Sequence, residues 1–296
     1  MGSDPGAGGA APAKRFESGP EHARGSDPAM RHRLALHTWT LDSTPLPDVL
    51  RIARDAGWPA IELRRIDFAR AAEKGEPAEA VLTLVRGSGL AVACVGGQLG
   101  WMFSDGAERA RLLAAMNESC RWAQALGART VMSPADMGEG DLARAAAAVR
   151  EVGDMGAAHG VRIALEAPSQ AAQLNTIQRL REVLAKAGHP SCGLLVDAYH
   201  LHRGGGGLRA VEELAPADIA YVQYSDVPES GLQPGQTLDR LPPGRGIVPF
   251  REFFALIARS GYAGYCSYEA PNPGAWARDP LTVAREALAA THAVLP

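Results

Sequence analysis

The stretch GLLVDAYH, residues 193–200, is an apolar run that ends on the carboxylate of Asp197, with His200 three residues later. Gly, Leu, Leu and Val in succession are typical of a buried strand. A carboxylate at the end of such a strand is costly to bury unless a group of opposite charge pairs with it. The stretch therefore predicts a buried strand with a polar site at its carboxyl end.

The same pattern recurs along the chain, because short apolar runs alternate with longer helical segments from residue 33 onward. The runs are RLALHTW (33–39), AIELR (60–64), LAVACVGG (90–97), ARTVMSP (128–134), VRIALEAP (161–168), CGLLVDAYH (192–200), IAYVQYSD (219–226) and GYCSYEAP (264–271). Strands that alternate with helices indicate a parallel sheet. Eight such units in about 265 residues predict a single-domain α/β fold, the (β/α)8 TIM barrel. A doubly wound sheet is the alternative, but no G-x-G-x-x-G opens a helix after the first run.

Helical periodicity is clearest at 45–57, 106–127, 141–160, 176–188 and 248–261, and many of these segments end at a glycine. Glycine is the residue expected just past a helix C-terminus. Residues 1–30 differ, being rich in Gly, Ala, Pro and charge without a hydrophobic period. We therefore expect a disordered tail at 1–30 and a barrel at 31–296.

Composition excludes several classes of protein. The 296 residues carry 30 basic and 33 acidic side chains, a net charge of −3. No basic stripe supports a nucleic-acid partner, and no apolar run reaches the ~18–20 residues of a membrane helix. The four cysteines lie far apart, as expected of reduced thiols in a cytosolic protein. With no apolar leader at the start, we expect a cytoplasmic location and leave a homo-oligomer open.

Oxygen-bearing side chains end the last four apolar runs: Glu166, Asp197, Gln223 and Glu269. In a TIM barrel the carboxyl ends of the strands meet at one rim, where the chemistry gathers. Three carboxylates there would repel one another unless they were protonated or neutralised by a cation. A divalent metal with oxygen ligands solves that problem, so the pattern predicts a metal site that includes Asp197.

Other interpretations of these polar residues remain open. A single strand-end acid is commonly a helix cap or an ion-pair partner. Asp226 is a candidate for a cap of the loop that follows it, and Glu62 for an ion pair with Arg64 or Arg65. His200 is either structural or a substrate contact at the same rim.

The segment DRLPPGRG (239–246) is a Pro/Gly-rich loop with two arginines at the predicted barrel mouth. Either Arg240 or Arg245 is placed to reach an anionic or polyhydroxylated ligand, and we favour Arg240. An ordinary solvated loop is the alternative.

Together, the motifs LEAP (165–168), VDAYH (196–200), VQYSD (222–226), DRLPPGRG and SYEAP (267–271) resemble the xylose isomerase-like TIM-barrel superfamily, the sugar phosphate isomerase/epimerase group. The resemblance covers roughly residues 33–290. It implies that Glu166, Asp197, Gln223 and Glu269 bind one divalent ion (Mn, Mg, Co or Zn), and that His200 and Arg240 contact the substrate.

Position 223 departs from the family pattern, because ketose epimerases usually have His where this chain has Gln223. Glutamine in this context is similar to the 3-dehydroshikimate dehydratase branch. Isomerase, epimerase and dehydratase activities therefore all stay open.

The function expected from these features is a metal-dependent isomerase or epimerase of a small ketose or polyhydroxylated ketone, acting through an enediolate. Glu166 and Glu269 would be its acid and base, and His37 and Trp39 would line the substrate site. The alternative is a metal-dependent dehydratase (lyase) of the 3-dehydroshikimate or keto-inositol type. A barrel that binds a small ligand without turning it over is the alternative of another class.

Overall fold

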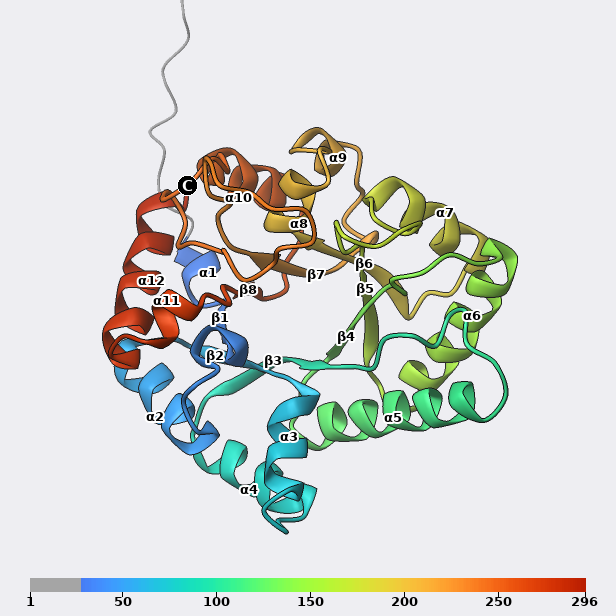
Figure 1. Cartoon of the computed structure of the whole chain (residues 1–296), viewed down its shortest axis with the longest axis horizontal. Coiled ribbons are helices and arrows are strands. Elements are labelled where there is room, and N and C mark those ends of the chain that lie inside the picture. The colour runs from blue at the N-terminus through green and yellow to red at the C-terminus, as the bar shows by residue number, and fades with distance from the viewer. Residues whose placement is uncertain (1–27) are drawn as a thin grey trace, which may run out of the picture.

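Eight parallel strands form a closed barrel, in the order β1-β2-β3-β4-β5-β6-β7-β8, in the computed structural model, which describes residues 28–296 (Figure 1). The strands are β1 Leu34–His37, β2 Ala60–Leu63, β3 Ala91–Gly96, β4 Thr130–Pro134, β5 Arg162–Glu166, β6 Cys192–Asp197, β7 Ile219–Tyr224 and β8 Cys266–Tyr268. Closure between β1 and β8 confirms the predicted TIM barrel, and the doubly wound alternative is wrong.

Helices surround the barrel on the outside (Figure 1). They are α1 Pro28–Arg31, the 3-10 helix η1 Thr38–Leu41, α2 Leu46–Ala56, α3 Arg65–Ala72, α4 Ala78–Gly87, α5 Gly106–Ala125, α6 Leu142–Ala158, α7 Ile177–Ala187, α8 Ala198–Arg203, α9 Arg209–Glu212, α10 Phe250–Arg259, α11 Pro273–Trp276 and α12 Pro280–Val294. Residues 1–27 of the tail expected at 1–30 lie outside the described residues. Met30, in α1, is buried in the core.

Each predicted strand and each of the five clearest predicted helices is present, with ends that differ by a few residues. In the run 192–200 the strand stops at Asp197, and α8 follows directly. Asp197 causes this change, since its Oδ1 accepts a hydrogen bond from the Tyr199 backbone N–H at 2.8 Å and caps the helix. His200 therefore lies on a helix, one turn beyond the strand.

The helices pack on the barrel through apolar faces. In α2 the buried residues Val49, Leu50, Ile52 and Ala53 share one side, and the helix ends at Gly57, whose φ of 93° is left-handed. Glycine adopts that conformation without the steric cost that other residues meet. Under α10, the ring of Tyr224 from β7 packs against Phe254 with ring centroids 5.2 Å apart. Such contacts form the layer between strands and helices, which is the main core.

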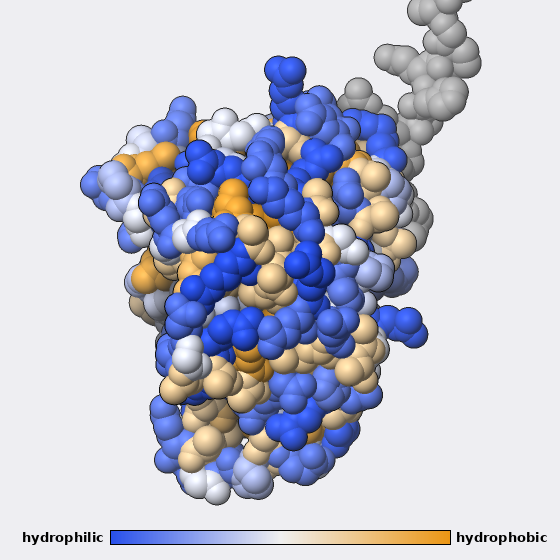
Figure 2. All heavy atoms as spheres, turned by 90° about the vertical axis from the view of Figure 1, so that its right-hand side faces the viewer, coloured by the Kyte–Doolittle hydropathy of each residue, from blue (hydrophilic) through white to orange (hydrophobic). Residues whose placement is uncertain are grey.

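The face that carries α6 and α7 is mostly hydrophilic, with hydrophobic residues scattered in small groups (Figure 2). Within residues 28–296, no helix is long and apolar enough to cross a membrane. All four cysteines are buried and unpaired, as the sequence predicted.

Candidate active site

The lumen of the barrel carries polar side chains at the carboxyl ends of the strands. Alternate residues of a strand face the same side, so the residue two positions after a lumen residue also faces the lumen. Small or apolar residues such as Ala35, Ala60, Ala164, Leu195 and Tyr221 fill the lower lumen. The polar residues two positions further along are His37, Glu62, Glu166, Asp197 and Gln223, and all five are buried. Glu269 joins them from the end of β8.

The ionic partner of Asp197 is Arg240, from the loop between β7 and α10. Arg240 is only 2% exposed, and its Nη1 lies 3.0 Å from Asp197 Oδ2 and 2.9 Å from Glu269 Oε2. Its Nη2 lies 3.1 Å from His200 Nε2, and the guanidinium carbon stands 4.3 Å from the centroid of the Tyr199 ring. One guanidinium therefore bridges two of the strand-end carboxylates and stacks on an aromatic ring.

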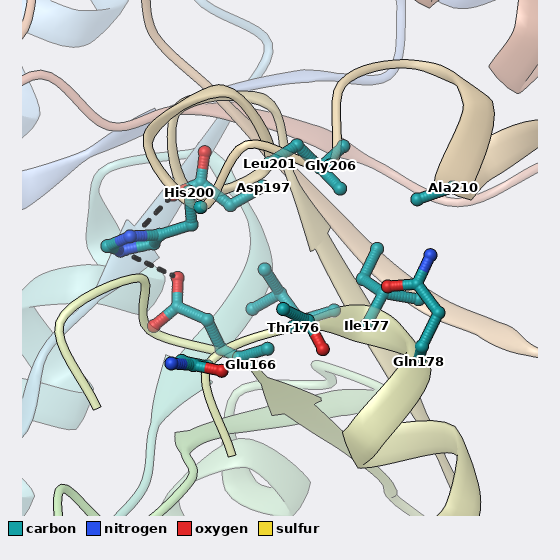
Figure 3. A pocket seen from close by; sticks show the side chains of 13 residues that line it. Glu166, Thr176, Ile177, Gln178, Asp197, His200, Leu201, Gly206 and Ala210 are labelled. Carbon is teal, nitrogen blue, oxygen red and sulfur yellow. Dashed lines mark ion pairs between the residues drawn. The ribbon is translucent and has the colours of Figure 1, made fainter. Parts of the chain in front are cut away.

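His200 lies between Glu166 and Asp197, and dashed lines in Figure 3 mark both contacts. Its Nε2 is 3.6 Å from Glu166 Oε1 and 3.8 Å from Asp197 Oδ2. One potential metal-ligand atom from each of these three residues lies within 4.8 Å of the others. The arrangement has the compactness that a metal site needs.

Glu62 reaches across the lumen from β2 to β7. Its Oε1 accepts a hydrogen bond from Gln223 Nε2 at 3.0 Å, and its Oε2 accepts one from the Tyr221 hydroxyl at 3.1 Å. An ion pair with Arg64 or Arg65, one interpretation that the sequence left open for Glu62, is not formed, because both arginines pair with other carboxylates. Arg64 instead bonds Asp42 at 2.5 Å, and Arg65 bonds Glu118 at 2.8 Å.

His37 lies close to the carboxylates of Glu269 and Glu62. Its Nε2 is 3.3 Å from Glu269 Oε1 and 3.7 Å from Glu62 Oε1. Its Nδ1 accepts the backbone N–H of Trp39 at 3.0 Å, so a neutral ring carries its proton on Nε2. That nitrogen is on the side of the ring that faces Glu269 and Glu62.

Burial and crowding raise the pKa of the acids in this cluster. Burial, with the neighbouring charges of Glu269 and Asp197, raises the pKa of Glu166 well above its ordinary value. Burial also raises the pKa of Glu269, although Arg240 opposes the shift. Burial and the charge of Glu269 raise the pKa of Glu62 to about 8. The cluster thus holds more carboxyl groups than one guanidinium neutralises, which favours binding of a further cation.

The two histidines are neutral near pH 7. Burial, aided by the charges of Arg64 and Arg240, lowers the pKa of His37 well below its ordinary value. Burial lowers the pKa of His200 to about 4, although Asp197 opposes the shift. Neutral imidazoles are able to donate a hydrogen bond through one nitrogen and accept through the other.

The loop that carries Arg240 is fastened by Asp226, the predicted cap. Asp226 is fully buried and pairs with Leu241 through two backbone hydrogen bonds. Its carboxylate accepts backbone N–H groups of Val227 and Val248 at 2.9 Å and of Gly246 at 2.8 Å. A Cβ at Gly246 would stand 2.0 Å from the Val227 carbonyl oxygen, so only glycine fits there.

The structure brings most of the predicted site residues together. Those in the cluster are His37, Glu166, Asp197, His200, Gln223, Arg240 and Glu269. Trp39 lies beside it, with Arg64 stacked 5.8 Å from its ring, and its carbonyl accepts the Trp276 indole N–H at 3.1 Å. Glu62 also belongs to the cluster, although it was not among the predicted site residues. Its place two residues after Ala60 on an alternating strand is the signal that identifies it.

Comparison with known proteins gives a family match over most of the chain. The sequence model described as Xylose isomerase-like TIM barrel matches residues 50–293. A 3-dehydroshikimate dehydratase of Pseudomonas aeruginosa is 29% identical over 137 residues, which is 46% of this chain and 22% of the relative. An inosose isomerase of Halalkalibacterium halodurans is 24% identical over 124 residues, 42% of this chain and 44% of the relative. The matches therefore span less than half the length of either relative.

Solved structures share the fold. An IOLI protein crystallised with a bound zinc atom superposes with a TM-score of 0.77 at 17% identity, covering 88% of this chain and 96% of that protein. At that identity, the likeness concerns the barrel architecture.

Proposed function

The chain belongs to the xylose isomerase-like TIM barrel family, and we propose that it is a divalent-metal-dependent isomerase or epimerase of a small ketose or polyhydroxylated ketone. The observation that carries this proposal is the convergence of Glu166, Asp197 and Glu269 on one buried site. Buried carboxylates in this number call for a cation. The names of the relatives, an isomerase and a dehydratase, support an enzyme of this general chemistry.

The donor set suits a hard divalent ion such as Mn²⁺, Mg²⁺, Co²⁺ or Zn²⁺. The proposed ligands are the carboxylates of Glu166, Asp197 and Glu269 and the amide oxygen of Gln223. Glu166 Oε1 and Gln223 Oε1 are buried and have no hydrogen-bond partner within residues 28–296, as expected of oxygens that would coordinate a cation. Arg240 would leave Asp197 and Glu269 when the ion binds, and would then be free to contact the substrate.

A bound divalent ion would supply a Lewis acid that polarises the ketone carbonyl. Glu166 and Glu269 approach from β5 and β8, with two strands between them. We assign one of them to remove the proton from the carbon next to the carbonyl and the other to return a proton. The neutral His37 ring would orient Glu269, because its Nε2 lies 3.3 Å from Glu269 Oε1.

The fate of the proton decides the product. Its return to the neighbouring carbon gives the isomer, and its return to the opposite face of the same carbon gives the epimer. The substrate of either reaction is a small keto-sugar or a related polyol ketone. No nucleic acid or membrane takes part in this proposal.

A dehydratase of the 3-dehydroshikimate or keto-inositol type is the second candidate. Gln223 favours it, together with the match to a 3-dehydroshikimate dehydratase. The same proton removal would then be followed by cleavage of the β-carbon–oxygen bond, with the hydroxyl leaving as water after protonation by the acid. A barrel that only binds its ligand needs no acid–base pair.

The experiment is proton exchange in D₂O with Mn²⁺, followed by NMR, using ketoses, inosose-type ketones and 3-dehydroshikimate in parallel. An isomerase or epimerase gives a deuterated isomer or epimer, and a dehydratase gives an unsaturated product. If compounds bind but none of them exchanges a proton for deuterium, the barrel that binds its ligand without turning it over would be favoured.

The variant Glu269→Gln tests the acid–base assignment. We expect it to keep the ligand and at least weak metal binding while losing exchange. The matched control is Glu229→Gln, the same change on the exposed part of the β7–α10 loop, which should exchange like the parent. Parent-like activity of Glu269→Gln would remove Glu269 from the mechanism.

A further inference from the structure

The side chain of Glu62 has no assigned role, although it is fully buried at the end of β2. It contacts two side chains of β7 across the lumen. Its Oε1 accepts a hydrogen bond from the amide N–H of Gln223 at 3.0 Å, and its Oε2 accepts one from the hydroxyl of Tyr221 at 3.1 Å. β2 and β7 are not neighbours, because β1 and β8 lie between them. Glu62 therefore links β2 to β7 across the lumen, within the cluster of polar side chains.

The hydrogen bond to Glu62 decides which way the Gln223 amide points. A glutamine amide has a donor end, the NH₂, and an acceptor end, the oxygen, and only the oxygen binds a hard cation. Because Nε2 is held by Glu62, Oε1 is the end left over, and it is buried without a hydrogen-bond partner among the described residues. With the amide reversed, an NH₂ group would take the place of that oxygen.

The register of the sheet puts this oxygen beside the proposed ligands. Gln223 on β7 is the partner of Asp197 on β6, and of Ser267 on β8, two residues before Glu269. His37 adds a contact from β1, since its Nε2 lies 3.7 Å from Glu62 Oε1 and 3.3 Å from Glu269 Oε1. Glu62 is thus bonded to Gln223 and also lies close to His37, which in turn approaches the proposed ligand Glu269.

We propose that Glu62 is a positioning residue that fixes the Gln223 amide with its oxygen toward the divalent metal ion. This inference rests on the proposed function, since it concerns the same ion. Groups that orient a metal ligand typically contribute 10–100-fold to metal affinity. Glu62 would act through Gln223 and would not itself contact the ion.

The test measures the Kd of Mn²⁺ by titration calorimetry for the parent and four single variants. Glu62→Leu has no acceptor, and Glu62→Asp is one methylene too short to span the lumen; both should weaken binding by about 10–100-fold. Glu62→Gln should keep the parent Kd, because its oxygen accepts from Gln223 while its NH₂ donates to the Tyr221 oxygen. Tyr221→Phe is the matched control, since it removes a bond to the same carboxyl without touching the amide, and should change Kd well under tenfold.

A double-mutant cycle shows whether Glu62 acts through Gln223. In a Gln223→Ala background, Glu62→Leu or Glu62→Asp should have no further effect on Kd. An equal loss in both backgrounds would overturn the proposal. Circular dichroism checks the fold, and Glu62→Asp decides the question if Glu62→Leu does not fold.

The outcomes separate this inference from the proposed function. A parent that binds no Mn²⁺ contradicts the proposed function itself. A parent that binds Mn²⁺, with Glu62→Asp and Glu62→Leu equal to it in Kd, leaves the function standing and overturns the role of Glu62. Loss of affinity in Glu62→Gln as severe as in Glu62→Leu would also overturn it, since amide orientation would not be the cause.

Discussion

Replacement of Arg240 by Ala tests whether its guanidinium occupies the position of the metal ion. In the structure, Nη1 is 3.0 Å from Asp197 Oδ2 and 2.9 Å from Glu269 Oε2, two groups of the proposed ligand set. Without metal, Arg240→Ala leaves these buried carboxylates with no cation beside them. Removal of one partner from a buried ion pair costs about 3–5 kcal/mol.

That cost converts into a large change in thermal stability. For a chain of this size, 1 kcal/mol moves Tm by about 2–4 °C, so the metal-free variant should melt about 6–20 °C below the parent. The loss should be smaller at pH 5 than at pH 8, because burial raises the pKa of Glu269 and a protonated Glu269 no longer needs a cation beside it. Differential scanning calorimetry in a chelating buffer measures both values.

Metal should reverse this effect. The ion has no guanidinium to displace in Arg240→Ala, so Mn²⁺ should bind at least about tenfold more tightly than in the parent, a gain of 1.4 kcal/mol. Arg240→Lys, which keeps the charge without the planar fork, should fall between the two. The reasoning would be refuted if metal-free Arg240→Ala melted with the parent, or if it bound Mn²⁺ more weakly.

Three further outcomes are expected. First, the pKa of Glu62 is raised from 4.5 to about 8, so between these two values the folded protein holds a proton that the unfolded chain releases. The metal-free parent should therefore lose stability relative to Glu62→Gln as the pH rises from about 5 to about 8. A difference in free energy of unfolding between the two, measured in urea, that stays constant with pH would contradict this. Asp226→Ala leaves three backbone N–H groups without their acceptor, so urea unfolding should show a loss of at least about 3 kcal/mol, and a loss under about 1 kcal/mol would mean that the loop is held by other contacts. Mn²⁺ at 100 times its Kd should stabilise the parent by about 2.7 kcal/mol, and a Glu166→Ala/Asp197→Ala double variant should show no such shift in calorimetry.

The fold was accessible from the sequence because its signals are local. Each strand is a short apolar run, and helices such as α2 and α7 end at glycines with left-handed φ, Gly57 and Gly188. The acids at the strand ends were also accessible, because the barrel brings every carboxyl end to one rim. Helices α3, α4 and α12 were not among the predicted segments, although the buried residues Val81, Leu82 and Val85 of α4 have helical spacing.

The partners of the site residues depend on register across the barrel, which no local pattern reveals. Glu62 bonds Gln223, 161 residues further along the chain, whereas the sequence alone suggests its neighbours Arg64 and Arg65 as partners. Likewise, the partner of Asp197 in the structure is Arg240, 43 residues away on a loop whose course Asp226 determines. Such pairs follow only from the closed barrel.

Metal content is the measurement that tests the central claim most directly. Parent protein purified without chelator or metal-affinity chromatography, and then equilibrated with Mn²⁺ and desalted, is compared by ICP-MS with the Glu166→Ala/Asp197→Ala double variant. We predict about one equivalent of divalent metal in the parent, as expected of a single oxygen-ligand site, and none in the variant. A parent that stays metal-free after soaking in Mn²⁺ or Co²⁺ would contradict the account, and Arg240 would then be the cation that the cluster permanently holds.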